Sequence, residues 1–336
     1  MNVRSYSDLA HLLRNNTQSL SDKFDLIVGV PRSGLLVALM LGMAWNVPVT
    51  DVKGALKSRL ISKGRTTTRH LDELNIDFDL KNLKILIVDD SCHTGKSITE
   101  AFEEINNKFN LAITKSLCCY VSPQSRHKVD YYFEILNPHH VFEWNISRNI
   151  ILEDACVDID GVLCPDPPYC ENKEKNLYLE YIKTAPVLMK PDRKIKYLVT
   201  NRLESTRKET EDWLKQNQIQ YHELIMHPAK TAFERSQRDS HWHKASFFKK
   251  SDTKFFIESD SQQAYEIYLK SGKPVMCYEN FAFPSGQKEL YAKGMSSFLL
   301  RSIKKLAPYL DSFGRNGGLF GYLRKKLVKL LKKHVA

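Results

Sequence analysis

Residues 85–97 hold the side chains with the clearest chemical potential in the chain. An apolar run, Ile85 to Val88, leads directly into the paired acids Asp89 and Asp90, and a turn of small residues, Ser91 to Ser97, follows them. Two carboxylates at the end of a strand can accept hydrogen bonds from the vicinal hydroxyls of a ribose. Successive main-chain N–H groups ahead of a helix form a cradle for a phosphate. The stretch therefore predicts a site for a sugar phosphate.

A nucleotide P-loop is the first alternative, because Gly95-Lys96-Ser97 has the ending of that motif. A P-loop needs a glycine five positions before Gly95, and residue 90 is Asp, so the motif fails. Paired acids after a strand also occur in metal sites and in ordinary loops. Their combination with the small-residue turn favours the sugar-phosphate site.

The same stretch, with its final Thr-Gly-x-Ser, resembles the phosphoribosyl pyrophosphate (PRPP) motif of the type I phosphoribosyltransferases. Ahead of it, the run Phe24 to Val30 predicts a buried strand that ends in Pro31-Arg32-Ser33-Gly34, where that family has its pyrophosphate loop. The resemblance implies PRPP as substrate, Mg²⁺ as cofactor and catalytic roles for Asp89 and Asp90. The PRPP-binding residues that it implies are Arg32, Ser33, Gly34, Asp89, Asp90, Ser91, Cys92, His93, Thr94, Gly95, Lys96 and Ser97.

A basic loop lies between these two motifs. Residues Lys57 to Arg69 carry five Lys or Arg among Ser, Thr and Gly, with little apolar periodicity. A solvated surface loop has the same composition. The resemblance favours a lid that closes over PRPP and stabilises the leaving pyrophosphate.

The second half of the chain begins a new pattern of strands that end in polar residues. A short apolar strand leads into Asp158-Ile159-Asp160-Gly161, a second strand ends at Thr200-Asn201, and a third, from Phe255, ends in Glu258-Ser259-Asp260. This order resembles the motifs of the haloacid dehalogenase-like (HAD) phosphohydrolases. The third motif differs from the commoner Gly-Asp or Asp-Asp forms, so either of its acids remains a candidate metal ligand.

The HAD resemblance implies a role for each of these residues. Asp158 would attack phosphorus, and Asp160 would protonate the leaving alcohol and later activate water. The implied phosphate-binding residues are Thr200, Asn201 and Lys244, with Lys230 as the second choice for the lysine. The implied Mg²⁺ ligands are Asp158, Asp160, Glu258 and Asp260. A HAD fold without catalysis is the alternative, and only about 40 residues, from Gly161 to Thr200, are left for a cap.

Length and composition agree with a two-domain enzyme. The 336 residues are long enough for two domains, and apolar runs that alternate with helical patterns predict a parallel sheet in the first half. With the two resemblances, this implies an α/β protein with two Rossmann-like parallel-sheet domains. The predicted limits are 1–150 for a type I phosphoribosyltransferase domain, 151–290 for a HAD-like domain and 291–336 for a basic tail. The seven cysteines show no CxxC pair, and no apolar run reaches the roughly 18 residues of a membrane span. These features predict reduced thiols in the cytoplasm, without disulfides or a zinc site.

The positive charge is concentrated at the carboxyl end. Of the formal net charge of +11, the residues from Arg301 on contribute +9, from ten Lys or Arg and one Asp, which leaves +2 for the first 300. Residues 319–335 place Leu and Phe at three- and four-residue steps, with six cations between Arg324 and Lys333. This pattern predicts an amphipathic helix that binds an anionic membrane surface, with docking onto protein as the alternative. Nucleic acid is not an expected partner, because the charge is not spread over the domains.

Together the two motif sets indicate sequential chemistry. The layout resembles the PRPP-dependent ribofuranosyltransferases of bacterial O-antigen and capsule assembly. It implies transfer of phosphoribose to a hydroxyl of a lipid-linked or oligosaccharide glycan, giving a β-ribofuranoside by inversion, and then removal of the 5-phosphate at the inner face of the cytoplasmic membrane. Two alternatives stay open: a nucleobase phosphoribosyltransferase fused to a nucleotidase for salvage, and a PRPP-sensing regulator that binds RNA. The acceptor sugar and the oligomeric state stay undetermined.

Overall fold

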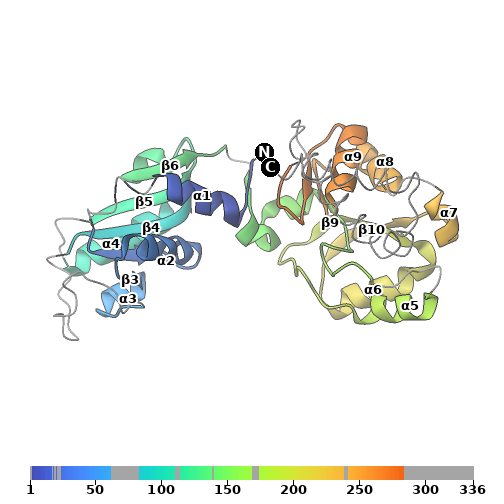
Figure 1. The fold of residues 1–336 in the computed structure, drawn as a ribbon, viewed down its shortest axis with the longest axis horizontal. Helices are drawn as coiled ribbons and strands as arrows, with labels where there is room; N and C mark the ends of the chain where they lie inside the picture. The colour runs from blue at the N-terminus through green and yellow to red at the C-terminus, as the bar shows by residue number, and fades with distance from the viewer. Residues whose placement is uncertain are drawn as a thin grey trace, which may run out of the picture. The chain divides into compact units, whose positions relative to one another are not determined.

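The computed structural model describes residues 2–16, 18, 20, 24–61, 83–109, 114–137, 140–168, 174–237 and 241–283. Most of the predicted lid and the whole predicted tail lie outside these residues. The chain divides into two compact units. One contains the described residues of Met1–Ala155, Met189–Tyr197 and Glu211–Glu223, and the other contains those of Cys156–Leu188, Leu198–Thr210 and 224–283. Two five-stranded sheets form the framework of this α/β protein (Figure 1).

The first sheet is parallel, with the strand order β3-β2-β4-β5-β6. Its strands are β2 (Leu26–Gly29), β3 (Val49–Asp51), β4 (Ile85–Cys92), β5 (Thr114–Val121) and β6 (Tyr131–Ile135). From β2 the chain moves to β3 on one side and then crosses to β4 on the other. Open α/β sheets bind ligands at the carboxyl ends of the strands beside such a switch point. In this sheet, those ends lead to Arg32 and hold Asp89 and Asp90.

Helices flank this sheet (Figure 1). They are α1 (Tyr6–Asn16) and α2 (Ser33–Trp45) in one apolar core, and α3 (Val52–Leu56) and α4 (Lys96–Phe109) in the other. The side chains of β4 alternate between the two cores, so that Leu86 lies in the first and Ile87 in the second. A strand that is buried on both faces has a continuous apolar sequence, which explains the run before Asp89.

A small parallel sheet closes the first unit. Strand β1 (Asn2–Arg4) pairs with β7 (His140–Phe142), and the 3-10 helix η4 (Glu143–Arg148) follows β7 directly. The main-chain N–H of Tyr6 donates to the Glu143 carboxylate at 2.8 Å, which ties the start of α1 to η4. Two further 3-10 helices, η3 (Arg126–Lys128) and η5 (Ile150–Asp154), lie in the connections.

The second sheet has the strand order β10-β9-β8-β11-β12. Its strands are β8 (Ala155–Val157), β9 (Ile195–Leu203), β10 (Tyr221–His227), β11 (Phe255–Glu258) and β12 (Val275–Cys277). Its helices are α5 (Lys175–Thr184), α6 (Arg207–Gln216), α7 (Ala232–Ser236), α8 (Trp242–Lys250) and α9 (Ser261–Ser271), with the 3-10 helix η6 (Glu204–Thr206) ahead of α6. Because the chain passes from β8 to β9 and later returns to β11, the switch point lies between β8 and β11. Asp158 and Glu258 are at that edge.

None of the described helices combines the length and the apolar character needed to cross a bilayer. Six cysteines fall within the described residues, and all six are buried free thiols. The seventh, Cys170, lies outside that part of the chain.

Candidate active sites

The strand that carries the acid pair is longer than the sequence predicted. The predicted strand end at Asp89 and Asp90 is wrong, because β4 continues to Cys92. Pairing explains the difference. On one side β2 leaves β4 at Val88, whereas on the other side β5 pairs with β4 as far as Cys92. The two acids therefore lie in a part of β4 that pairs with β5 but no longer with β2.

The two carboxyl groups of the pair have different surroundings, although both side chains are buried. Asp90 accepts from the Ser33 hydroxyl at 2.7 Å through Oδ1 and from the Trp144 indole N–H at 2.6 Å through Oδ2. Asp89 accepts from the main-chain N–H of Asp90 at 2.9 Å. Burial, with the neighbouring Asp90 carboxyl, raises the pKa of Asp89 to about 9. At neutral pH the pair consequently holds a proton on Asp89, which limits the repulsion between two adjacent acids.

Asp89→Asn is expected to stabilise the folded protein more strongly as the pH rises. Asp89 keeps its proton up to a pKa of about 9 when folded, but an unfolded Asp releases it near pH 4. Its contribution to stability is thus complete below about pH 4 and is lost progressively towards about pH 9. Asn does not titrate, so the variant avoids this loss. In thermal unfolding at about pH 5 and about pH 8, the Tm advantage of the variant should be larger at the higher pH; an advantage that shrinks would contradict the assignment.

The predicted pyrophosphate loop connects β2 to α2. The peptide bond between Pro31 and Arg32 is cis, Arg32 is exposed, and α2 begins at Ser33. Gly34 is buried where the helix crosses β4, and a Cβ there would lie 2.6 Å from the carbonyl oxygen of Val88 and 3.0 Å from Asp89 Oδ1. A glycine is therefore required at residue 34 for close packing against the acid pair. A contact between Gly34 and PRPP would come from the main chain.

The predicted 5-phosphate loop is shorter than the sequence indicated. Ser91 and Cys92 belong to β4, and α4 begins at Lys96, so the loop proper is His93 to Gly95. The Thr94 hydroxyl accepts from the main-chain N–H of Lys96 at 3.4 Å. Helix α4 has 14 residues, and the positive end of its dipole favours a bound anion. Ser97 is exposed in the first turn of α4.

Two features of this loop differ from a simple phosphate cradle. The Cys92 side chain is buried in the core, so only its main chain can contact PRPP. Hydrogen bonding from Cys118 is the largest of the influences that lower the pKa of the Cys92 thiol to about 6. Lys128, which the sequence interpretation missed, donates from Nζ to the carbonyl oxygen of Thr94 at 2.6 Å. The only indication in the sequence was the basic run Arg126 to Lys128.

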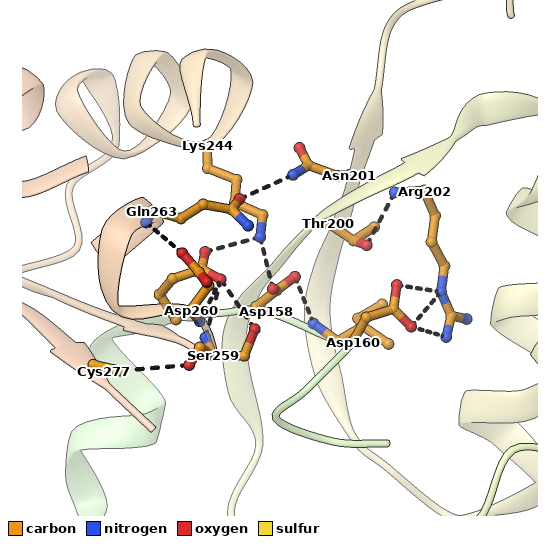
Figure 2. Close-up of polar contacts among 12 residues, drawn as sticks. Asp158, Asp160, Thr200, Asn201, Arg202, Lys244, Ser259, Asp260, Gln263 and Cys277 are labelled. Atoms are coloured by element: carbon orange, nitrogen blue, oxygen red, sulfur yellow. Dashed lines mark hydrogen bonds and ion pairs between the residues drawn. The ribbon is translucent and has the colours of Figure 1, made fainter. Parts of the chain in front are cut away.

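The second site is built around a buried lysine. Lys244 reaches from α8 toward Asp158 (Figure 2), and its ammonium lies 2.6 Å from Asp158 Oδ2 and 2.8 Å from Glu258 Oε2. Burial lowers the pKa of Lys244, but the two carboxylates more than offset this and raise it. Burial and the Glu258 carboxylate raise the pKa of Asp158, while Lys244 opposes that shift. One ammonium between two carboxylates leaves an excess of negative charge.

Asp160 pairs with a different cation, although its charge adds to the influences that raise the pKa of Asp158. Its carboxylate is held by Arg202, whose Nη2 is 2.6 Å from Oδ1 and whose Nε is 3.0 Å from Oδ2, and Figure 2 shows Asp160 turned toward this arginine. Arg202 is buried, with 1% of its side chain exposed against 18% for Asp160. Burial lowers the pKa of Arg202, but Asp160 more than offsets this and raises it. The sequence interpretation missed Arg202, although it follows Thr200 and Asn201 directly.

The other predicted residues of this site have internal partners. The buried Thr200 hydroxyl accepts from the main-chain N–H of Arg202 at 3.1 Å, and the Asn201 amide donates to Gln263 at 3.3 Å. Asp260 caps α9 by accepting from the N–H of Gln263 at 2.8 Å. Lys230 bonds Glu234 through its main-chain N–H. Hydrogen bonds thus join Asp158, Glu258 and Lys244, whereas the side chains of Asp160 and Asp260 bond other partners.

A glycine shapes the turn between the two aspartates and the rest of the site. Gly161 has φ +77°, in the region that favours glycine, and a Cβ at this position would lie 2.3 Å from the Cβ of Ser259. The turn after β8 therefore packs directly on the turn after β11. This close approach explains why glycine follows the second aspartate.

Two of the four acidic residues predicted to bind Mg²⁺ in the second site are suitably placed for it. Among the described residues, no three His, Cys, Asp or Glu side chains gather as a metal-binding group. Mg²⁺ in phosphoryl-transfer sites often uses only one or two carboxylates and takes its other ligands from water and substrate phosphate. Asp158 and Glu258 supply two such carboxylates at one place. A set of four acidic ligands is not assembled here.

The first half of the chain also matches a known family. Residues 2–149 match the family described as the phosphoribosyl transferase domain. No curated protein matches the chain.

Three solved structures illustrate the similarity. The purine phosphoribosyltransferase of Pyrococcus horikoshii Ot3 is 26% identical, with 43% of this chain and 92% of that chain covered and a TM-score of 0.32. The xanthine-guanine-hypoxanthine phosphoribosyltransferase of Helicobacter pylori is 18% identical, with 43% and 93% covered and a TM-score of 0.31. The orotate phosphoribosyltransferase of Aeropyrum pernix is 22% identical, with 39% and 71% covered and a TM-score of 0.26.

The family match coincides with the first parallel sheet, its switch point and the acid pair of β4. Residues 2–149 form a phosphoribosyltransferase domain of type I.

Proposed function

We propose that the protein is a bifunctional ribofuranosyltransferase, which transfers phosphoribose from PRPP to a glycan hydroxyl and then removes the 5-phosphate. The proposed division places the transferase in residues 1–150, the HAD-like phosphatase in 151–290 and a membrane-binding tail in 291–336. The observation that carries the proposal is the buried ion-paired cluster of Asp158, Lys244 and Glu258 in a chain that begins with a phosphoribosyltransferase domain. A phosphate-cleaving site on the same chain would remove the 5-phosphate of the transferred phosphoribose.

In the first step, the acid pair of β4 holds the ribose hydroxyls, and the His93 to Ser97 segment holds the 5-phosphate. The bond between C1 of the ribose and the pyrophosphate oxygen breaks, and a bond from C1 to the acceptor oxygen forms. The acceptor hydroxyl releases its proton to solvent, and pyrophosphate leaves toward Arg32 and the main chain at Ser33, because the Ser33 hydroxyl already donates to Asp90. Attack on the face opposite pyrophosphate converts α-PRPP into a β-ribofuranoside. Donors fixed near the departing anion lower the barrier.

In the second step, an oxygen of Asp158 attacks phosphorus and the bond from phosphorus to O5 of the ribose breaks. We assign both proton transfers to Asp160, which first has to leave Arg202 and take up a proton from solvent. It then gives this proton to the departing alkoxide and later accepts one from the water that hydrolyses the aspartyl-phosphate. Lys244 holds Asp158 in place through the 2.6 Å contact and neutralises part of the charge that gathers there. The products are the ribofuranoside and inorganic phosphate.

Magnesium is the proposed cofactor of both steps. In the second site Asp158 and Glu258 would hold it, because they are the two carboxylates that converge there. When bound, Mg²⁺ offsets the repulsion between an anionic nucleophile and a phosphate ester.

The acceptor class is tested by offering the protein PRPP and Mg²⁺ with either oligosaccharides or nucleobases. The proposal expects PRPP consumption with a glycan acceptor and none with bases. Consumption with purine or pyrimidine bases would identify the salvage enzyme instead. RNA binding that weakens with salt, without turnover of PRPP, would identify the regulator.

The basic tail gives a separate prediction, based on the sequence because residues 291–336 lie outside the described part of the chain. Removal of the residues from Gly317 on is expected to abolish sedimentation with anionic phospholipid vesicles, because the removed residues carry six cations between Arg324 and Lys333. PRPP consumption should stay unchanged. Neutral phosphatidylcholine vesicles are the control. Equal sedimentation of the full-length and shortened chains with anionic vesicles would refute membrane binding by the tail.

A further inference from the structure

The Asp90 carboxylate is held by donors from two distant parts of the first unit. Ser33 belongs to the start of α2, and Trp144 belongs to η4, 54 positions after Asp90 in the chain. Each donor takes a different oxygen, at 2.7 Å and 2.6 Å. Asp90 is only 4% exposed, so these two bonds offset much of the cost of removing the carboxylate from water.

The indole ring of Trp144 is itself held by aromatic neighbours. It stacks on Phe142, with ring centroids 4.7 Å apart and 9° between the planes. Tyr6 packs at 5.6 Å with 46° between the planes, and Tyr120 lies 6.4 Å away. Both Phe142 and Tyr120 are buried. The pairing of β1 with β7 and the bond from Tyr6 to Glu143 fix η4 at this place, so the indole N–H points at Asp90 from a rigid support.

We propose that Trp144 is a positioning residue for PRPP: its indole N–H holds Asp90 in the orientation that binds the ribose, opposite the Ser33 hydroxyl. This inference rests on the proposed binding of PRPP at the acid pair. Asp90 has to turn a lone pair toward a ribose hydroxyl without losing its other partners. Donors at both oxygens restrict rotation of the carboxylate. The Asp90 side chain therefore loses little further conformational freedom when PRPP binds, which lowers the entropic cost of binding.

A purely structural role for Trp144, as one aromatic residue of a packed cluster, makes a different prediction. In that case only the ring would matter, and Phe would replace it with little change in affinity for PRPP. Phe keeps an aromatic ring beside Phe142 but has no N–H for Asp90. Trp144→Phe therefore separates the hydrogen bond from the stacking.

The test compares the binding of PRPP with Mg²⁺ to the unaltered protein, Trp144→Phe and Tyr6→Phe, by titration calorimetry on the full chain. Loss of a hydrogen bond to a charged group is expected to raise the Kd of Trp144→Phe by about tenfold to a hundredfold. Tyr6→Phe removes a hydroxyl from the same aromatic cluster and leaves the indole N–H in place, so its Kd should stay within about twofold. A Kd for Trp144→Phe equal to that of the unaltered protein would overturn the inference.

A second measurement uses only the unaltered protein and therefore does not depend on whether a variant folds. In ¹H–¹⁵N spectra of the unaltered protein, the indole resonance of Trp144 is expected to shift when PRPP and Mg²⁺ are added, because its acceptor Asp90 takes up a ribose hydroxyl. The resonance of Trp213, which is buried on α6, serves as the internal reference. A Trp144 resonance that PRPP leaves unmoved would also overturn the inference. Failure of the unaltered protein to bind PRPP at all would instead refute the proposed function.

Discussion

Asp158→Asn is expected to consume PRPP at the normal rate but to release inorganic phosphate at least about a thousandfold more slowly. The amide cannot act as the nucleophile, so no aspartyl-phosphate forms and the product keeps its 5-phosphate. The fold should survive, because Asp158 and Glu258 share one ammonium and the variant removes one of two buried negative charges. Phosphate release and PRPP consumption would be measured in the same reaction.

Asp212→Asn is the matched control for this variant. Asp212 is an exposed acid on α6, and the same change of acid to amide there should leave both rates unaltered. Phosphate release by Asp158→Asn at the rate of the unaltered protein would remove Asp158 from the reaction.

Lys244→Met is expected to lower the free energy of unfolding by about 3–5 kcal/mol, as is usual when one partner of a buried ion pair is removed. Lys244 is 2% exposed, and its loss leaves the carboxylates of Asp158 and Glu258 together in the interior. Adding Glu258→Gln should restore part of this loss, because one of the two uncompensated charges is then removed. Chemical denaturation of the single and double variants measures both effects.

Lys249→Met provides the control on the same helix. Lys249 is exposed near the end of α8, so its replacement should change the free energy of unfolding by no more than about 0.5 kcal/mol. If Lys244→Met were as stable as this control, the buried cluster would not be the element that holds the second site together.

The presence of β4, β9 and β11 could be predicted because each depends on a short apolar run, but the place where two of them end could not: β4 continues past Asp89 and Asp90 to Cys92, and β9 continues past Thr200 to Leu203. The apolar run before Asp89 indicated β4, the run before Thr200 indicated β9, and the run from Phe255 indicated β11. The Asp-x-Asp-Gly turn likewise follows from local sequence, since Gly161 adopts a conformation that few other residues tolerate.

Contacts between distant segments could not be predicted in this way. The length of β4 depends on where β2 and β5 stop pairing with it, and neither limit can be predicted from residues 85–97 alone. The partners of Asp90 and Asp160 likewise come from elsewhere in the chain, Trp144 from η4 and Arg202 from β9. Neither a tryptophan nor an arginine indicates such a role by its residue type alone, so both roles can be recognised only in the folded structure.

The central claim is that one chain both attaches phosphoribose and removes its phosphate. The most direct test is the mass of the product that the unaltered protein makes from PRPP, Mg²⁺ and an oligosaccharide acceptor. We expect an acceptor that has gained one pentose without phosphate, together with pyrophosphate and inorganic phosphate in equal amounts. An acceptor that still carries phosphoribose at the end of the reaction, with no inorganic phosphate released, would contradict it.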